Sequence, residues 1–352
     1  MPSRDGEQRR IDRLCGRFGS QNFFAENRRH VIVSAGLRWQ RWLPEFVALG
    51  TIWGSSFVFM RMASQQFGPW STAWLRVSIA LLVLLPLLVW RGQVGMLKTH
   101  WRGVMGMGIV NSAIPFACYA YAVLSLTTGM SSLLNATSPL FGALIAWVWL
   151  GERPTPWRTL GLSLGFVGVG LLAAGMPGGL SLSAHANGWA VLACLLATTC
   201  YGLGTAFSQR HLPSVPALTT ATGSLLGACV VLALPGVWFW PKQWPDSSAW
   251  LGLLVVGAMC TGLAYLLYFR LIAKTGGART LTVTYLIPLV ANVIGVWLLN
   301  ETMTWQMLWC GLLILLGTAL THVKTQRRQI NDTESVPFGS DQSPVQPTRT
   351  GH

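Results

Sequence analysis

Residues 138–152 read SPLFGALIAWVWLGE, and residues 287–301 read IPLVANVIGVWLLNE. Each stretch is an apolar run with proline in second place and glutamate in last place, and five positions are identical. With the residues that precede it, each run approaches the ~20 apolar residues that cross the hydrocarbon core of a bilayer. The sequence therefore contains the same membrane element twice.

The duplication extends beyond these two stretches. Residues 101–152 align with residues 250–301 at a constant offset of 149, with nine identities and no gap. An offset of 148 aligns Trp53 with Tyr201 near the start of each half. Each half has room for five spans, an odd number, so the second half must enter the membrane upside down. Such an inverted repeat is typical of secondary transporters that bind substrate between the halves.

The composition is that of a membrane protein. Of the 352 residues, 52% are hydrophobic and 10% are charged, whereas a soluble domain carries about 25% charged residues. The mean hydropathy is +0.47. Connections between the apolar runs are too short for a folded domain outside the bilayer. These observations exclude a cytosolic enzyme, a nucleic-acid-binding module and a disulfide scaffold.

We predict an all-α integral membrane protein with ten transmembrane helices, arranged as two inverted five-helix repeats around a central cavity. The expected domains are a basic N-terminal tail (1–42), a first repeat (43–174), an outer linker (175–187), a second repeat (188–323) and a disordered C-terminal tail (324–352). The expected spans are 43–60, 71–90, 102–124, 128–149, 157–174, 188–207, 215–235, 249–272, 279–299 and 304–323. Gly161 and Gly165 have the spacing that permits close contact between membrane helices.

The distribution of basic residues predicts the orientation in the membrane. With the N-terminus inside, 22 of the 25 Lys and Arg residues fall on the inner side. Only Arg61 and Lys242 fall on the outer side, and Arg76 lies within the second span. Because Lys and Arg accumulate on the cytoplasmic side of membrane proteins, we expect both termini in the cytoplasm of a multi-pass protein of the cell membrane.

Neither a metal nor a cofactor is expected. Six of the seven cysteines lie in apolar runs, and the six histidines lie in tails, loops or helix ends. A buried cysteine is ordinarily a small hydrophobic residue, and histidines so dispersed cannot form a metal site. No predicted span holds Asp, Glu, Lys or His at depth, which argues against an enzyme because acid–base catalysis needs such groups.

An ordered set of short motifs resembles the EamA domain of the drug/metabolite transporter superfamily, whose members carry two such domains. The resemblance covers about residues 45–323 and implies ten helices around a central cavity and export or exchange of small metabolites. Two positions depart from it: Asn300 stands where the first half has Gly151, and Arg76 has no basic counterpart at Ser224. The motifs are LGTIWGSSF (49–57), AWLR (73–76), SPL (138–140), WLGER (149–153), IPL (287–289) and LLNE (298–301).

Polar and aromatic residues deep in the spans are the candidates for substrate binding. Such residues are costly in lipid and tend to face the interior of the bundle, although hydrogen bonding between helices explains any single one equally well. Pro139 and Pro288 lie at matched depths and predict paired kinks. The cavity candidates are Trp53, Arg76, Asn111, Tyr119, Asn135, Tyr201, Tyr265, Tyr268, Tyr285 and Asn292.

Three charged residues have two interpretations each. Arg76 binds an anionic group within the membrane, or its side chain reaches outward to the headgroups. Glu152 and Glu301 end their spans at opposite faces of the membrane. Either glutamate is a ligand of neighbouring backbone or arginine at a helix end, or it belongs to a gate.

The function expected from these features is secondary transport of a small metabolite by alternating access. The expected substrate is amino-acid-like in size and neutral, zwitterionic or anionic, because no carboxylate lies at depth to pair with a cationic one. The lipid bilayer is the other expected partner, nucleic acid is not expected, and the oligomeric state is left open. The alternative is a structural or sensory membrane protein that has kept the fold and lost transport.

The charge bias generates a topology prediction. Reporter fusions after His352 and within residues 91–101 should report the cytoplasm, and fusions within 175–187 should report the outside. An external C-terminus would contradict both the even number of spans and the inverted repeat.

Overall fold

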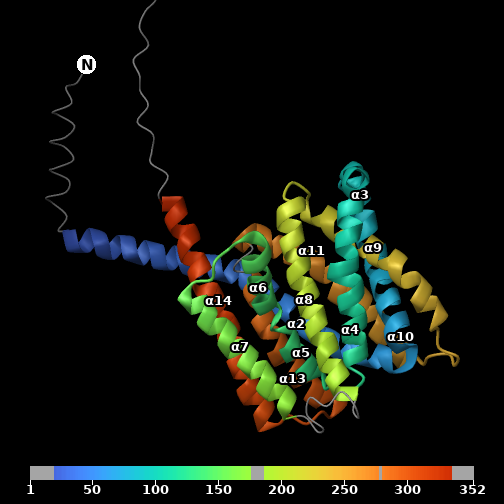
Figure 1. Cartoon of the computed structure of the whole chain (residues 1–352). Helices are drawn as coiled ribbons and strands as arrows, with labels where there is room; N and C mark the ends of the chain where they lie inside the picture. Colours follow the sequence, from blue (N-terminus) through green and yellow to red (C-terminus); the bar gives the residue numbers. More distant parts are fainter. Residues whose placement is uncertain (1–19, 176–185, 277–279, 335–352) are drawn as a thin grey trace, which may run out of the picture.

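The computed structural model describes residues 20–175, 186–276 and 280–334, with side chains described over 42–175, 187–276 and 280–321. Within these ranges the chain is helical, contains no strand and forms a bundle (Figure 1). The elements are α2 (Ser20–Trp90), α3 (Val94–Gly108), η1 (Ile109–Ala113), α4 (Ile114–Ala122), α5 (Thr128–Asn135), α6 (Ser138–Leu150), α7 (Pro156–Ala174), α8 (Ala186–His211), α9 (Ala217–Trp238), α10 (Ser247–Leu254), η2 (Val255–Leu263), α11 (Ala264–Thr275), η3 (Thr282–Tyr285), α13 (Leu286–Leu299) and α14 (Trp305–Glu334).

Eight helical stretches of the described residues are long and apolar enough to cross a membrane, and Trp305–Thr321 of α14 is a shorter apolar helix. The all-helical membrane fold predicted from composition is confirmed. Lipid offers the backbone no hydrogen-bond partner, so a spanning segment must satisfy its own polar groups as a helix. The eight stretches are Trp42–Trp90, Val94–Ala122, Thr128–Leu150, Pro156–Ala174, Asn187–His211, Ala217–Trp238, Ser247–Thr275 and Thr282–Leu299.

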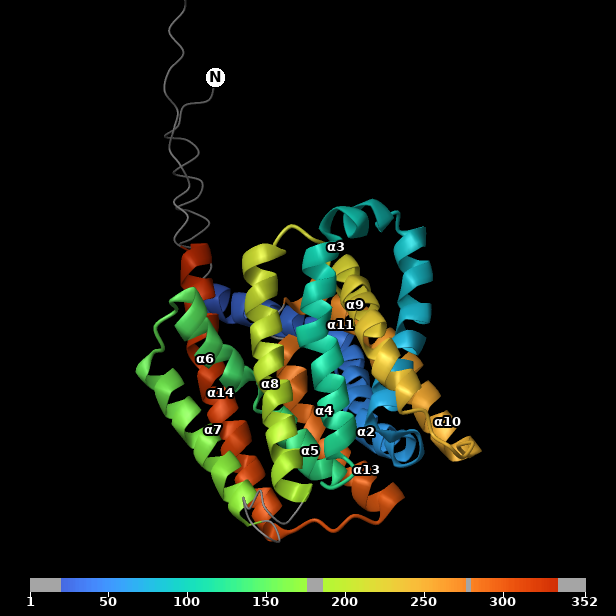
Figure 2. The ribbon, with the colours of Figure 1, turned by 45° about the vertical axis from the view of Figure 1, so that its right-hand side comes forward.

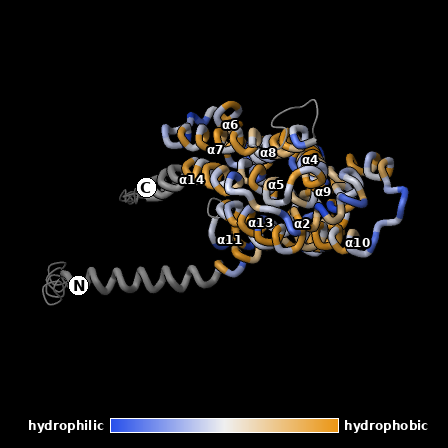
Figure 3. Tube along the Cα trace, turned by 90° about the horizontal axis from the view of Figure 1, so that it is seen from below, coloured by the Kyte–Doolittle hydropathy of each residue, from blue (hydrophilic) through white to orange (hydrophobic). Residues whose placement is uncertain are grey.

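Apolar side chains cover the outside of the bundle. Figure 3 shows hydrophobic residues along every helix that it labels. Several of the most exposed side chains are large and apolar, among them Trp90, Val148, Leu234 and Trp297. Water-exposed apolar surface of this extent would be unfavourable, so this surface is suited to contact with lipid.

The chain turns inside α2 at a single residue. Gly68 has φ 73° and ψ 169°, and the residues on both sides of it are helical. A positive φ suits glycine because it has no Cβ, and Pro69 disfavours the α conformation in the residue before it. The connection expected over residues 61–70 is therefore wrong in length: helix continues to Phe67 and resumes at Pro69.

The local irregularities of the helices recur at the repeat offset. A break at Ala136–Thr137 separates α5 from α6 three residues before Pro139, and the 3₁₀ segment η3 ends three residues before Pro288. The π-helical segment η1, shifted by 149 residues, falls inside the π-helical segment η2. Short π segments inside α-helices are frequent at functional sites.

The ends of α6 and α13 are also alike. Gly151 and Asn300 both adopt the left-handed conformation, with φ of 73° and 52°. In each case the next residue, Glu152 or Glu301, donates its backbone N–H to the carbonyl six residues earlier, at 3.2 Å. Asparagine tolerates this conformation better than other residues with a Cβ, which explains why Asn300 can stand at the position of Gly151.

The two halves of the chain do not form separate units, because helices of one half pack against helices of the other. The first part of the chain, α2 to α7, contacts the second part through α2 with α9, α10, η2 and α13, and through α4 and α6 with α8. The helices α7 and α14 also run together (Figure 2). Gly161 and Gly165 lie at this contact, where Gly161 faces the carbonyl of Gly317.

The expected tails are described only in part. Residues 1–19, most of the linker at 175–187 and residues 335–352 lie outside the described residues. Helix α14 continues to Glu334, and the disordered tail over 324–352 stays a prediction. Extending an existing helix needs no new nucleation, and Lys, Gln and Arg in this segment are good helix formers.

The contact of α7 with α14 generates a stability prediction. Gly161→Leu should lower the thermal stability of the purified protein in detergent, because a side chain there meets the backbone of Gly317; overpacking typically costs about 1–3 kcal/mol. Gly170→Leu, in the same helix, is the matched control because no atom lies within 4 Å of its added Cβ. Equal melting temperatures for the two variants would contradict this packing.

Candidate functional site

Arg76 lies inside the bundle, with its side chain held by three elements. Its Nε donates to Thr261 Oγ1 of η2 at 2.9 Å, and Nη1 donates to Met60 Sδ of α2 at 3.4 Å. The guanidinium carbon is 3.9 Å from the ring centre of Phe116 in α4. Only 8% of the residue is exposed. The side chain thus points into the protein instead of reaching outward to the headgroups.

No carboxylate neutralises Arg76 within the described part of the chain. The ion pairs found there join Arg61 to Glu301, Arg158 to Glu152, and Arg270 and Lys274 to Glu45. The Phe116 ring attracts the cation through its negative face, and the contacts to Thr261 and Met60 occupy two of the five guanidinium N–H donors. The remaining donors give this position the capacity to bind an anion.

The repeat supplies an internal comparison for Arg76. At the same offsets, Ser224 corresponds to Arg76 and Ser112 corresponds to Thr261. The hydroxyls of Ser224 and Ser112 are 2.9 Å apart, so a short neutral contact occupies the related position. The two halves therefore share a polar contact at this level, and only one of them carries a charge there.

Two candidate tyrosines and an asparagine form one cluster. The rings of Tyr119 and Tyr201 stack with centres 6.3 Å apart. The hydroxyl of Tyr119 donates to Oδ1 of Asn135 at 3.0 Å, across to α5. Phe57 packs edge-on against Tyr119. This cluster joins α2, α4, α5 and α8 in the middle of the bundle.

A second aromatic cluster lies between α2 and α11. Trp53 contacts Tyr268 with ring centres 5.3 Å apart, and Tyr265 stacks on Phe269. Phe269 also contacts Tyr268, with ring centres 5.9 Å apart. This cluster therefore joins Trp53, Tyr265 and Tyr268.

The other candidates lie in separate contacts. Asn111 of η1 packs against Gly204 of α8. The amide nitrogen of Asn292 donates to the carbonyl of Pro288 at 2.8 Å, and its side chain faces Gly129. Tyr285 is half-buried in η3. Asn111 and Asn292 thus pack against neighbouring helices, and neither meets Arg76 in the described contacts.

Two cavities open at the other end of the bundle from Glu301. One, of about 520 Å³, is lined by residues of α3 and α8, including His100, Arg102 and His211. The second, of about 680 Å³, lies between residues 148–151 at the end of α6 and Gln209 and Arg210 of α8. No predicted cavity residue lines either one, because the aromatic candidates pack against one another.

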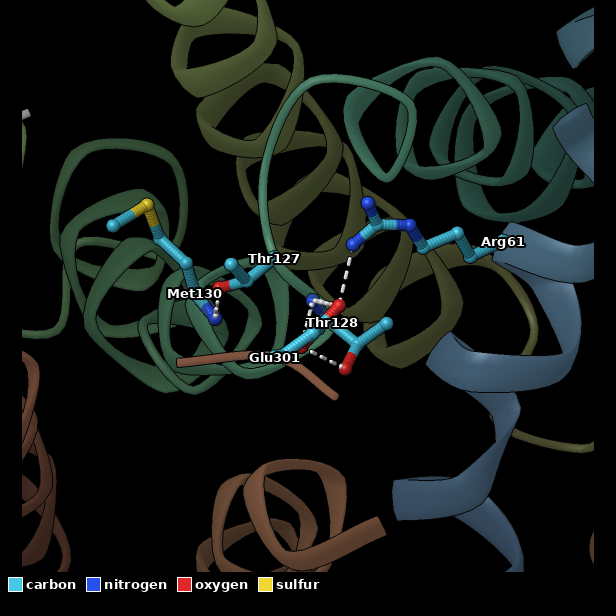
Figure 4. Close-up of polar contacts among 5 residues, drawn as sticks. All are labelled: Arg61, Thr127, Thr128, Met130 and Glu301. Atoms are coloured by element: carbon cyan, nitrogen blue, oxygen red, sulfur yellow. Dashed lines mark hydrogen bonds and ion pairs between the residues drawn. The ribbon is translucent and has the colours of Figure 1, made fainter. Parts of the chain in front are cut away.

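Glu301, toward the opposite end of the bundle, lies beside Thr128 and Arg61 (Figure 4). Its carboxylate accepts hydrogen bonds from the backbone N–H of Thr128 at 3.0 Å and from the Thr128 hydroxyl at 2.8 Å. It also pairs with Arg61 of α2. The carboxylate thereby sits at the N-terminus of α5, where the helix dipole favours negative charge. Only 8% of the side chain is exposed.

Glu152, the repeat-related residue, has a different environment. Its side chain is 53% exposed, and its ion pair is with Arg158, in the next helix along the chain, at 3.5 Å. A single exposed pair of this kind contributes little to stability. The two glutamates therefore share a backbone conformation and differ in their side-chain contacts.

Sequence reasoning missed several of these contacts. Met60 and Phe116 appear as ordinary apolar residues, and Arg61 served only as a marker of topology. The offset of 149 from Glu152 to Glu301 was visible, but the approach of Thr128 to Glu301 depends on how α5 and α13 pack. Among the described residues no group of three or more His, Cys, Asp or Glu could hold a metal ion.

Comparison with known proteins finds a family that matches both halves of the chain. The EamA-like transporter family matches residues 41–174 and 188–323. The chain is 25% identical to the uncharacterized transporter YvbV of Bacillus subtilis, over 79% of this chain and 90% of that one. It is also 25% identical to the uncharacterized inner membrane transporter YedA of Escherichia coli K12, over 76% of this chain and 87% of that one.

The fold also has a solved counterpart. A crystal structure of another protein, 23% identical in sequence, superposes with a TM-score of 0.60 and covers 82% of this chain and 98% of that one. The likeness concerns the fold alone.

The contrast between the two glutamates generates a stability prediction. Glu301→Ala should lower the free energy of unfolding by about 2–3 kcal/mol, because the Thr128 N–H and Arg61 lose a buried partner. Glu152→Ala should change it by no more than about 0.5 kcal/mol, as for other exposed positions. Thermal unfolding in one detergent measures both, and a larger loss for Glu152→Ala would contradict the assignment.

Proposed function

The chain belongs to the EamA-like transporter family, and we propose that it carries an amino-acid-sized zwitterion or anion across the cell membrane by alternating access. It is a multi-pass membrane transporter, and its family implies a small-molecule substrate. The family and the names of its relatives indicate transport rather than catalysis. We further propose that it works as an exporter or an exchanger, and that Arg76 binds the negative group of the substrate.

The observation that carries this proposal is the unneutralised guanidinium of Arg76. An unpaired charge in a low-dielectric interior costs several kcal/mol, so its retention at a buried position favours a role in binding. A guanidinium offers parallel N–H donors that match a carboxylate. The aromatic ring of Phe116 beside it suits the uncharged body of an amino-acid-like substrate.

We propose ten membrane crossings with both termini in the cytoplasm. The stretch Trp42–Trp90 has 49 residues and at 1.5 Å per residue would extend about 70 Å as one rod, more than twice the hydrocarbon thickness. The turn at Gly68 divides it into two crossings of ordinary length. Seven further stretches and the apolar part of α14 bring the number to ten.

An inverted repeat is supported by several features that recur at the sequence offset. The π-helical segments, the breaks before Pro139 and Pro288, and the left-handed caps before Glu152 and Glu301 all occur in related positions. The contacts between halves also come in related pairs: α6 packs on α8 as α13 packs on α2. Two halves of opposite orientation can exchange conformations, which is how such repeats alternate access.

The proposal predicts a substrate-selective effect of Arg76. In proteoliposome counterflow, Arg76→Ala should lower kcat/KM for carboxylate-bearing substrates by roughly tenfold or more, the value of a hydrogen-bonded charge. Transport of neutral analogues should stay within about threefold of that by the unsubstituted protein, because the variant keeps its fold and the remaining binding contacts of these analogues.

Ser224→Ala, at the repeat-related position, is the matched control and should leave carboxylate transport unchanged. The proposal fails if Arg76→Ala transports carboxylates normally, or if a permanently cationic compound is the best substrate. Absence of counterflow with every substrate class, in a folded protein, would favour the alternative of a structural or sensory protein on this fold.

A further inference from the structure

The contacts of Glu301 link both halves of the molecule at one face. Glu301 follows α13 in the second half, whereas Thr128 and Arg61 belong to the first half. Glu301 and Thr128 are also packed closely around Gly295, so this end of the bundle is closed between α13, α5 and α2. By the charge bias this is the outer face.

At the inner face, the residues that correspond to Arg61 and Glu301 do not pair with each other. Gln209 and Arg210 lie 148 and 149 residues after Arg61, at the end of α8. They are exposed and line the cavity of about 680 Å³ that separates them from the end of α6, directly before Glu152. Glu152 instead pairs with Arg158 of its own half.

The local backbone at the two glutamates is alike, whereas their side-chain contacts differ. Both glutamates follow a left-handed cap, and both donate the same backbone hydrogen bond at 3.2 Å. Both helices that lead to them, α6 and α13, pack against the first helix of the opposite half. Similar local backbones with different side-chain contacts are expected when an inverted repeat adopts one of two alternating conformations.

We propose that Glu301 and Glu152 are the carboxylates of two alternating latches, and that the structure has the outer latch closed and the inner latch open. The outer latch, Glu301 with Arg61 and the Thr128 N–H, is closed. In the outward-facing state it opens, and Glu152 closes the inner face against Gln209 and Arg210. This inference rests on the proposed function, because the latches exchange during transport.

The physical basis is that the contacts of one carboxylate replace those of the other. Closing one latch satisfies a carboxylate while opening the other returns a carboxylate to water. The free energies of the two states then remain close, and a substrate can shift the population between them. A single latch without its counterpart would hold the carrier in one state, because a ligand needs a large differential affinity to overcome it.

Site-directed labelling with a membrane-impermeant maleimide tests the latches. Leu150→Cys reports the inner face and Leu299→Cys, its repeat-related counterpart, reports the outer face. Intact cells expose the outside, inside-out vesicles expose the inside, and mass spectrometry of the peptide separates each probe from the native cysteines. Lys242→Gln, which removes an exposed charge of the outer side that belongs to none of the ion pairs described above, is the control and should alter neither rate.

Opening the outer latch should move both probes in opposite directions. Glu301→Gln should raise outside labelling of Leu299→Cys by about fivefold or more, a typical coupling between two sites, and should lower inside labelling of Leu150→Cys. Arg61→Gln should act in the same direction and keeps the test valid if Glu301→Gln fails to fold. Unchanged rates in both variants would overturn the proposal.

The inner latch generates a separate prediction. Glu152→Gln should leave inside labelling of Leu150→Cys high, lower outside labelling of Leu299→Cys and slow counterflow, although its stability is unchanged. Increased outside labelling in this variant would overturn the proposal. If labelling responds as expected but no substrate shows counterflow, the latch proposal is supported and the proposed transport function fails. If counterflow is observed but labelling does not respond, the transport function is supported and the latch proposal fails.

Discussion

Hydrocarbon offers no hydrogen-bond partner, and every irregularity in these helices has to be compensated within the protein. Pro139 cannot donate to the carbonyl of Asn135, and the hydroxyl of Ser138 donates to it at 2.6 Å. Next to it, the hydroxyl of Thr318 reaches the carbonyl of Ala136 from α14 at 3.2 Å. In the π segment η2, Thr261 donates to the carbonyl of Val256 while accepting from Arg76. Breaks in these helices therefore occur where side chains of the bundle can donate hydrogen bonds to the carbonyls that the break leaves unpaired.

The same constraint decides how much of the fold could be predicted. Apolar runs and the scarcity of charge indicate spanning helices, because the requirement acts on each segment separately. The turn at Gly68 was missed, although Gly68 and Pro69 are a recognisable signal, because a connection of one residue is shorter than loops usually are. The end of α14 at Glu334 could not be predicted, because the polarity of a tail says little about whether a helix ends where the membrane does.

The candidate site could be predicted only in its residue types. Depth in a span made Arg76 and the aromatic residues candidates, but the direction of a side chain depends on helix rotation and rotamer. Either direction was open for Arg76 from its position alone, and its contacts with Thr261, Met60 and Phe116 arise from three separate helices. The partners of Glu301 likewise come from residues far away in the sequence. No spacing rule connects Thr128 or Arg61 to position 301.

The presence of arginine at position 76 and serine at position 224 has an electrical consequence. A carrier that binds a monoanion at a single membrane-embedded cation is neutral there when loaded and positive when unloaded. Moving one elementary charge through the membrane potential is worth about 2.3 kcal/mol per 100 mV. The voltage would then act on the return of the unloaded carrier and not on the loaded step. One-for-one exchange of anions would be insensitive to voltage, whereas net movement in one direction would be driven or opposed by it.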